Sequence, residues 1–317
     1  MRAGVPLSYP CAARKIAARH GGGPGQMQFI GQVIADSLLL GGIYTLAAVG
    51  LSLSFGVTRI INFAHGEAVM LGAYGAFWGL ALLHFDPLLA LPFLMAAGTV
   101  AGYVLFRTVI SRLLNAPQEN QILLTFGLAL ILQNLALYFW TGDQRATTPD
   151  YALNSFLIGS VVISYGQLIA AAAALVLVGA VFVWLRRSEL GRATRALAEN
   201  RRAAVLVGIN VPHLYALTFG ISVAMGAAAG AVLSFILPIT PFMGADILVK
   251  TFAIIVLGGF GNVAGATIGA FLLAFAETAV AYYVPEGNGW SEAVAFAVLF
   301  AVLILRPGGI LGQVVAE

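Results

Sequence analysis

The feature that most constrains this sequence is a series of apolar runs, most of them long enough to cross a lipid bilayer. A helix of about 20 apolar residues spans the hydrocarbon core. The chain has 317 residues, of which 60% are hydrophobic and 9% are charged. Its apolar runs cover residues 28–57, 61–83, 88–110, 122–140, 164–185, 213–237, 246–260, 265–284 and 290–305. The sequence therefore predicts an all-α fold, a polytopic transmembrane helical bundle with about eight or nine membrane segments, some broken or re-entrant.

Several other classes of protein are excluded by what the sequence lacks. A β-barrel would show alternating strands of about ten residues, and none occur. Cys11 is the only cysteine, so we expect no disulfide framework and no cysteine metal site. The nearest approach to a phosphate-binding loop, at residues 244–251, has Val249 where a glycine is required. We expect no cofactor, no metal ion, no nucleic-acid partner and no catalytic chemistry in this chain.

The first 26 residues differ in composition from the rest of the chain. They carry four basic residues and a glycine-rich run, but no apolar segment of the length that a signal peptide needs. We expect residues 1–26 to be a disordered or non-native basic tail. Residues 27–317 are expected to form a single transmembrane domain.

The orientation of the bundle is indicated by its arginines. Six of the sixteen basic residues lie in one polar stretch, residues 186–212. Cytoplasmic loops carry an excess of Lys and Arg, so we expect this stretch to be cytoplasmic. Five apolar segments precede it, which places the N-terminus outside. A broken or re-entrant segment at 61–83 would instead return the N-terminus to the cytoplasm, and the sequence leaves both arrangements open.

A first polar interruption stands where a membrane segment should begin. The stretch "NFAHGE" places Asn62, His65, Gly66 and Glu67 within six positions. Ionisable groups at membrane depth are costly and persist where they face a cavity or a partner, so a discontinuous helix lining a polar path is one interpretation. The alternative is a short loop at the membrane surface, with Glu67 in the first turn of a helix.

A second interruption is rich in glycine. Gly258, Gly259 and Gly261 precede Asn262, and we expect a tight turn between two short helical pieces. Broken helices in corresponding halves of a transporter point to its transport site, and the two interruptions share a weak Asn-x-Ala repeat. Plain packing of helices through glycine is the alternative.

The arginine-rich stretch itself predicts a short amphipathic helix. Small and polar residues follow helical spacing on one side, with a glycine as C-cap and Pro212 as a stop. Such a helix is suited to docking into a groove of a cytoplasmic partner, whereas a solvated connecting loop is the simpler interpretation. The candidate docking residues are Arg195, Ala196, Glu199, Asn200, Ala203, Val207 and Gly208.

Taken together, these stretches resemble the branched-chain amino-acid permeases of ATP-binding-cassette importers, the LivH/LivM type, and are closer to LivH. The resemblance rests on "GGIYTLAAVGLSLSFGVTRIINFAHGEAVMLGAYGAF", "LGRATRALAENRRAAVLVGINVPHLYALTFGISVAMGAAAGAVL", "TFAIIVLGGFGNVAGATIGAFLLAFAE" and "LRPGGILG". It covers essentially residues 27–312.

The resemblance implies a multi-pass permease subunit of the bacterial inner membrane, which has no ATPase activity of its own. It implies a second related permease, two cytoplasmic ATPase subunits and a periplasmic substrate-binding protein as partners. Residues 196–208, with Glu199 and Ala203 central, would be the coupling helix in a cleft of the ATPase. The two polar interruptions would then shape or gate the translocation path.

Other functions stay open at the level of sequence. Urea and short-chain amide importers share this type of permease, so the cargo is not decided. A stand-alone secondary transporter or channel is the second candidate. An intramembrane enzyme is disfavoured, because no catalytic constellation is present.

Overall fold

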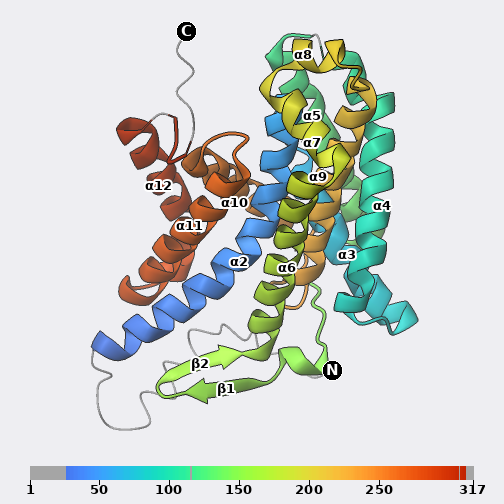
Figure 1. Ribbon diagram of the computed structural model, residues 1–317. Helices are drawn as coiled ribbons and strands as arrows, with labels where there is room; N and C mark the ends of the chain where they lie inside the picture. Colours follow the sequence, from blue (N-terminus) through green and yellow to red (C-terminus); the bar gives the residue numbers. More distant parts are fainter. Residues whose placement is uncertain (1–25, 115, 307, 312–317) are drawn as a thin grey trace, which may run out of the picture.

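The computed structural model describes residues 26–114, 116–306 and 308–311, and within them the chain is almost entirely helical (Figure 1). The α-helices are α2 (Gln26–Thr58), α3 (His65–Leu83), α4 (Pro87–Thr108), α5 (Gln118–Trp140), α6 (Tyr165–Arg187), α7 (Glu189–Glu199), α8 (Arg201–Leu206), α9 (Val211–Leu233), α10 (Met243–Gly258), α11 (Val263–Tyr283) and α12 (Ser291–Leu305). Three short 3-10 turns lie at Ile110–Leu113, Asp150–Ala152 and Gly287–Trp290. The only strands in the described part, β1 (Ser155–Ile158) and β2 (Val161–Ser164), form an antiparallel hairpin.

Seven helices of the described part are long and apolar enough to span a membrane: α2, α3, α4, α5, α6, α9 and α11. The two remaining apolar segments form the shorter helices α10 and α12. The expected helical membrane bundle is therefore confirmed, and the chain is a multi-pass membrane protein. The tail expected at residues 1–26 lies outside the described residues, except for Gln26, where α2 begins.

The molecule has two distinct ends (Figure 1). The β1–β2 hairpin lies at one end, and α7 and α8 lie at the other. Helix α2 begins beside the hairpin, where the Gln32 side chain both donates to and accepts from the backbone of Val162, and it ends next to α7. The start of α2 and the arginine-rich stretch are therefore at opposite ends. This separation fits the arrangement with five crossings, one of the two that the sequence left open.

Helix α9 is the packing centre of the bundle, and α2, α3 and α4 surround it. Its sequence is rich in Ala and Gly, which lets neighbouring backbones approach closely. A Cβ atom at Gly102 of α4 would lie 2.9 Å from the Cα of Gly220. Gly226 and Gly230 lie against α3 in the same way. The outer helices α4 and α5 bury only 22% and 17% of their apolar windows inside the protein, as a lipid-facing surface requires.

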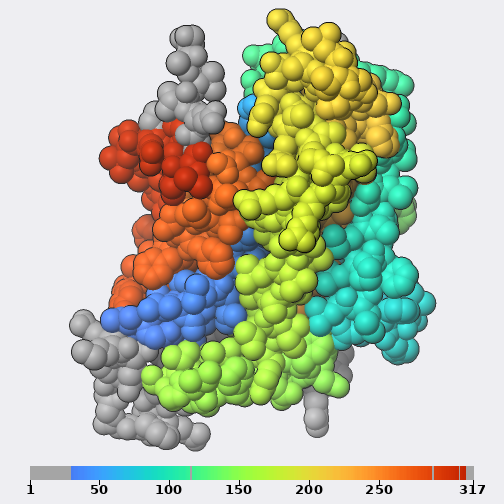
Figure 2. Space-filling view, in the orientation of Figure 1, coloured from blue at the N-terminus to red at the C-terminus, as the bar shows by residue number. Residues whose placement is uncertain are grey.

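Helices α10, α11 and α12 form a lobe beside this bundle. Tyr44 and Leu51 of α2 belong to one buried cluster with Ile254 of α10 and Leu273 of α11. Figure 2 shows the lobe beside the column formed by α6, α7 and α8, with α2 emerging between the lobe and the hairpin. Helix α2 is thus the element that both parts share.

Candidate functional site

The first polar interruption forms a turn that brings the chain back into the bundle. Helix α2 ends at Thr58, and Arg59 takes a left-handed conformation with φ 59°. Asn62 is buried; its side-chain Oδ1 accepts from the backbone N–H of Ala64 at 3.1 Å, and its carbonyl accepts from His65 at 3.3 Å. The amide side chain thus satisfies the backbone N–H of Ala64, which the break in the helix leaves without a helical partner.

His65 begins α3 deep inside the protein, with no exposed surface. Its Nε2 lies 3.0 Å from the carbonyl oxygen of Ala47 on α2, and its Nδ1 lies 3.5 Å from the Ser222 hydroxyl on α9. A carbonyl can only accept, so Nε2 carries the hydrogen and Nδ1 is left to accept from Ser222. His65 therefore ties the start of α3 to the middle of two long helices.

Gly66 and Glu67 bring α3 against the start of α10. Gly66 packs directly on the backbone of Gly244, where any side chain would collide. The Glu67 side chain lies beside the same residue: its Oε1 would be 3.1 Å from a Cβ at Gly244. Its Oε2 is buried without a hydrogen-bond partner among the described residues. Two helices thus begin facing one another inside the bundle, with a carboxylate at their junction.

The start of α10 is a part of this junction that the sequence analysis missed. The stretch "PITPFMGAD" carries two prolines and a glycine between two apolar segments, which is a signal for a broken helix. Gly244 is the residue that meets Gly66. A contact between positions so distant in the sequence cannot be predicted from local sequence patterns.

The second interruption is the expected tight turn, and it joins α10 to α11. Gly259 and Gly261 have φ values of 101° and 74°, which side chains rarely adopt. Asn262 caps α11 by accepting from the backbone of Gly265 at 2.9 Å, and its amide donates to Leu311 at 3.0 Å.

The structure places the two interruptions apart. Gly261 packs on Gly56, close to the end of α2. His65 instead contacts Ala47, nine residues earlier on α2, which is about 13 Å along the helix. The glycine turn borders a cavity of about 500 Å³ at the α7–α8 end, together with Arg59, Arg186 and Arg195.

The arginine-rich stretch forms two helices, so the expected single helix over residues 196–208 is wrong. Asn200 interrupts it with an extended conformation at φ −149° and ψ 101°. Its side chain accepts from the Ala203 backbone at 3.0 Å and so caps the start of α8. This cap stabilises the first turn of a new helix, so the chain begins α8 here instead of continuing α7.

The end of α8 has the glycine that was expected there. Gly208 has φ 82°, and the backbone N–H groups of Gly208 and Ile209 donate to Val205 and Ala204. This is the paired hydrogen bonding by which glycine commonly ends a helix. Pro212 lies in the first turn of α9 and so belongs to the start of the next helix.

The candidate docking residues lie on the surface of this end. All seven are exposed: Arg195, Ala196, Glu199, Asn200, Ala203, Val207 and Gly208. Leu206 is 87% exposed and Val207 is 75% exposed, although both are apolar and lie outside the membrane spans. The tip of α8 is thus an apolar surface flanked by Arg201 and Arg202.

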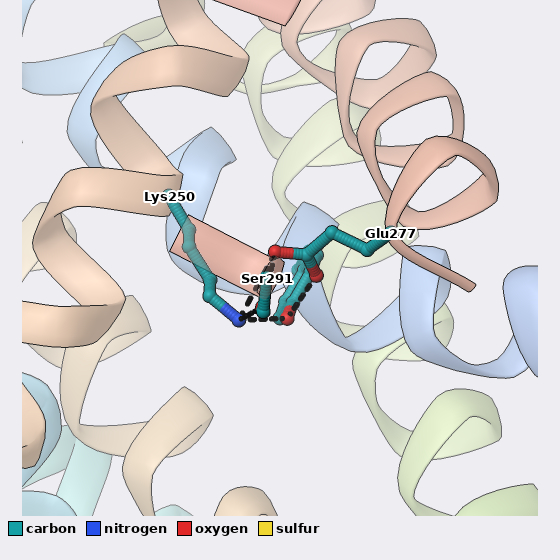
Figure 3. A network of polar contacts seen from close by, with 4 residues as sticks. Lys250, Glu277 and Ser291 are labelled. Atoms are coloured by element: carbon teal, nitrogen blue, oxygen red, sulfur yellow. Dashed lines mark hydrogen bonds and ion pairs between the residues drawn. The ribbon is translucent and has the colours of Figure 1, made fainter. Parts of the chain in front are cut away.

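A buried polar network joins the lobe to α2 (Figure 3). Lys250 Nζ lies 3.1 Å from Glu277 Oε1 and donates to Tyr44 at 2.9 Å and to Ser291 at 2.7 Å. Tyr44 and Ser291 each donate to Glu277 at 2.8 Å. Lys250 is not paired with Asp36. Asp36 instead accepts from Tyr282 at 2.7 Å and from Gln32 at 3.0 Å.

Comparison with known proteins identifies relatives over most of the chain. A family model described as "Branched-chain amino acid transport system / permease component" matches residues 33–303. The high-affinity branched-chain amino acid transport system permease protein BraD of Pseudomonas aeruginosa is 33% identical over 296 residues, covering 89% of this chain and 95% of that protein. LivH of Escherichia coli K12, described in the same terms, is 32% identical over 302 residues, covering 91% and 97%. A probable LivH of Methanocaldococcus jannaschii is 28% identical over 298 residues, covering 88% and 92%.

Proposed function

The chain belongs to the family of branched-chain amino acid transport system permease components, and from that premise we propose that it forms half of the translocation path of an ATP-driven importer. Its cargo is a branched-chain or related amino acid, delivered by a periplasmic substrate-binding protein. ATP is hydrolysed on partner subunits, and this chain is a transport subunit rather than an enzyme.

The assembly has four partners around this chain, in the bacterial inner membrane. They are a second related permease, two cytoplasmic ATPase subunits and the binding protein. The α7–α8 end is cytoplasmic because its arginines follow the distribution of basic residues in membrane proteins, and the hairpin end then faces the binding protein. Residues 27–317 act as one permease domain, with residues 186–212 as its coupling loop.

The observation that carries this proposal is the apolar tip of α8. Exposed apolar residues on a polar, arginine-rich surface outside the membrane mark a protein–protein contact. Leu206 and Val207 are the most exposed of them. Their side chains can contact an ATPase subunit, and the small side chain of Ala203 lets that subunit approach the short helix closely.

The junction of α3 and α10 is the proposed gate. Gly66 and Glu67 lie against Gly244 at the start of α10, while Asn62 shapes the turn before α3 and His65 ties the start of α3 to α2. The group from Gly258 to Asn262 acts at the cytoplasmic end, as the turn that lets α10 and α11 move with α2. Conformational change at such starts and turns opens or closes a path without unfolding a long helix.

Glu67→Gln is expected to lower uptake about tenfold, equivalent to about 1.4 kcal/mol, because it replaces the buried carboxyl group at this junction by an amide of nearly the same volume. Assembly with the partner subunits should be unchanged. Glu119→Gln is the matched control, since Glu119 also lies in the first turn of a helix but is exposed. Uptake rates of the two variants, normalised to assembled complex, make the comparison. Equal rates would show that the junction is only structural.

The proposal is tested by copurification. The chain, expressed from its native operon and solubilised in mild detergent, is isolated by a tag, and its companions are identified by mass spectrometry. A second permease and ATPase subunits are expected in stoichiometric amounts. A chain that elutes alone, or only with itself, would contradict the importer.

A further inference from the structure

Three buried donor groups without a partner gather near the end of α3. In the described part of the chain, six buried side-chain nitrogen and oxygen atoms have no hydrogen-bond partner. Three of the six are the Tyr74 hydroxyl oxygen, Trp78 Nε1 and Arg145 Nε. A buried polar group without a partner lowers the stability of a protein, so three of them in one place require an explanation.

Ring and side-chain contacts bring these three groups together. Tyr74 and Trp78 are one turn apart on α3. The guanidinium carbon of Arg145 lies 5.2 Å from the centre of the Trp78 ring, and its Nη2 donates to the Trp140 carbonyl at 3.0 Å. The Trp140 ring in turn stacks on the Tyr74 ring, with 4.2 Å between the ring centres. The end of α3, the end of α5 and the loop that follows α5 thus form one cluster.

Arg145 is held in this cluster by its backbone as well as by its side chain. Its N–H donates to the Ile239 carbonyl at 3.0 Å, and its carbonyl accepts from the Ile239 N–H at 2.7 Å. Among the described residues no carboxylate forms an ion pair with it. Asp143, the nearest acid in the sequence, accepts from the Thr141 hydroxyl instead. A guanidinium group that is fixed in place and has no counter-ion attracts an anion.

The chemistry of the three groups favours a carboxylate as their ligand. The N–H groups of Trp78 and Arg145 can only donate, and the Tyr74 hydroxyl can donate as well. A carboxylate only accepts, offers two oxygens and forms paired hydrogen bonds with guanidinium. Water would leave the Arg145 charge without a counter-charge. Tyr74 has no exposed surface, which favours a small molecule inside the protein over a side chain of a docked binding protein.

The same face of α3 leads from this cluster to the proposed gate. Tyr74 and Trp78 follow Glu67 by seven and eleven residues, close to two and three helical turns, so all three share one face. Glu67 Oε2 also lacks a partner among the described residues. The Trp140 ring covers the Tyr74 ring, and α5 buries little of its length inside the protein. Movement of the end of α5 therefore uncovers the cluster at the cost of few contacts.

We propose that Tyr74, Trp78 and Arg145 form a subsite that binds the carboxylate of an amino acid entering from the hairpin end. The cluster lies at that end because Tyr151, just before β1, donates to Asp86, just after α3, at 3.1 Å. This inference rests on the proposed function and deepens it. It names the part of the cargo that this chain recognises before the gate.

The test is photolabelling of the assembled complex of both permeases and the ATPases in nanodiscs, without the binding protein. The probe is photo-leucine, a leucine analogue with a diazirine in its side chain and a free carboxylate. Peptides that cover residues 66–83 and 141–149 should be labelled. Excess leucine should suppress this labelling, whereas leucinamide, which lacks the carboxylate, should not.

Tyr74→Phe and Trp78→Phe keep an aromatic ring at each position and remove the donor. Each should raise the photo-leucine concentration for half-maximal labelling about tenfold, because a hydrogen bond to a charged group is lost. Neither change breaks a hydrogen bond within the described part of the protein, so both variants should fold and assemble. Tyr138→Phe and Trp290→Phe are the matched controls, since these side chains are 80% and 55% exposed.

Unchanged half-maximal concentrations in both variants would overturn the proposal and leave water as the partner of the three donors. Suppression by leucinamide as strong as by leucine would overturn it too, because the carboxylate would not be recognised. ATP-driven uptake of leucine by the wild-type complex with its binding protein is measured separately. Uptake without labelling of these peptides would reject the subsite alone, whereas no uptake would contradict the proposed function itself.

Discussion

Leu206→Asp should abolish copurification of the ATPase subunits while leaving the second permease bound. Leu206 is 87% exposed at the tip of α8, and its neighbour Val207 is 75% exposed. Burial of a leucine side chain contributes about 1.5–3 kcal/mol, and a carboxylate in its place must also be desolvated. The combined loss of about 3 kcal/mol or more weakens binding on the order of 100-fold. The yield of ATPase per permease, measured by quantitative mass spectrometry, tests the prediction.

The matched control for this substitution is Leu157→Asp. Leu157 lies on β1 at the hairpin end, and it is 69% exposed. It receives the same change in charge and shape at the opposite end of the molecule. ATPase should copurify with this variant as with the wild type. If Leu206→Asp also retains the ATPase in full, α8 is not the docking element.

Lys250→Met is expected to destabilise the protein by about 3–5 kcal/mol, because it leaves a charged Glu277 buried without its counter-ion. Glu277 is 6% exposed, and its remaining neighbours Tyr44 and Ser291 are uncharged. Glu277→Gln instead leaves the Lys250 ammonium group without its counter-ion. The double variant Lys250→Met/Glu277→Gln removes both charges together and should recover most of the stability. Thermal unfolding in detergent is the measurement.

The double variant separates two explanations of any loss of stability. If the pair acts only through size and packing, the two single losses add in the double variant. If charge balance dominates, the double variant is more stable than either single variant. Additive losses would contradict the role assigned to the ion pair in holding α10, α11 and α12 to α2.

The class of fold was predictable because lipid imposes a simple rule on the sequence. Backbone groups inside a bilayer must be paired within the segment, so an apolar run of sufficient length becomes a helix. All nine apolar runs became helices, and the turn at Gly259 and Gly261 followed from residues that alone adopt its conformation readily. For the helices and this turn, the chemistry of neighbouring residues was sufficient to predict the structure.

The remaining features could not be predicted, because they depend on tertiary contacts or on competition between local backbone conformations. The pairing of Lys250 with Glu277 could not be predicted from the sequence, because it depends on how α10 and α11 pack. The junction of Gly66 with Gly244 joins positions that no local pattern relates. At Asn200 the small-residue spacing predicted one helix, whereas the capping of Ala203 by the Asn200 side chain began a second.

The role of this chain as one half of a partner-dependent importer is tested most directly by uptake into proteoliposomes. The purified chain is reconstituted alone, or with the second permease and the ATPases, and labelled leucine is presented with the binding protein. The account predicts uptake only with all subunits, binding protein and ATP present, and competition by other branched-chain amino acids. Uptake by this chain alone, driven by a proton or sodium gradient without ATP, would contradict it and identify a secondary transporter.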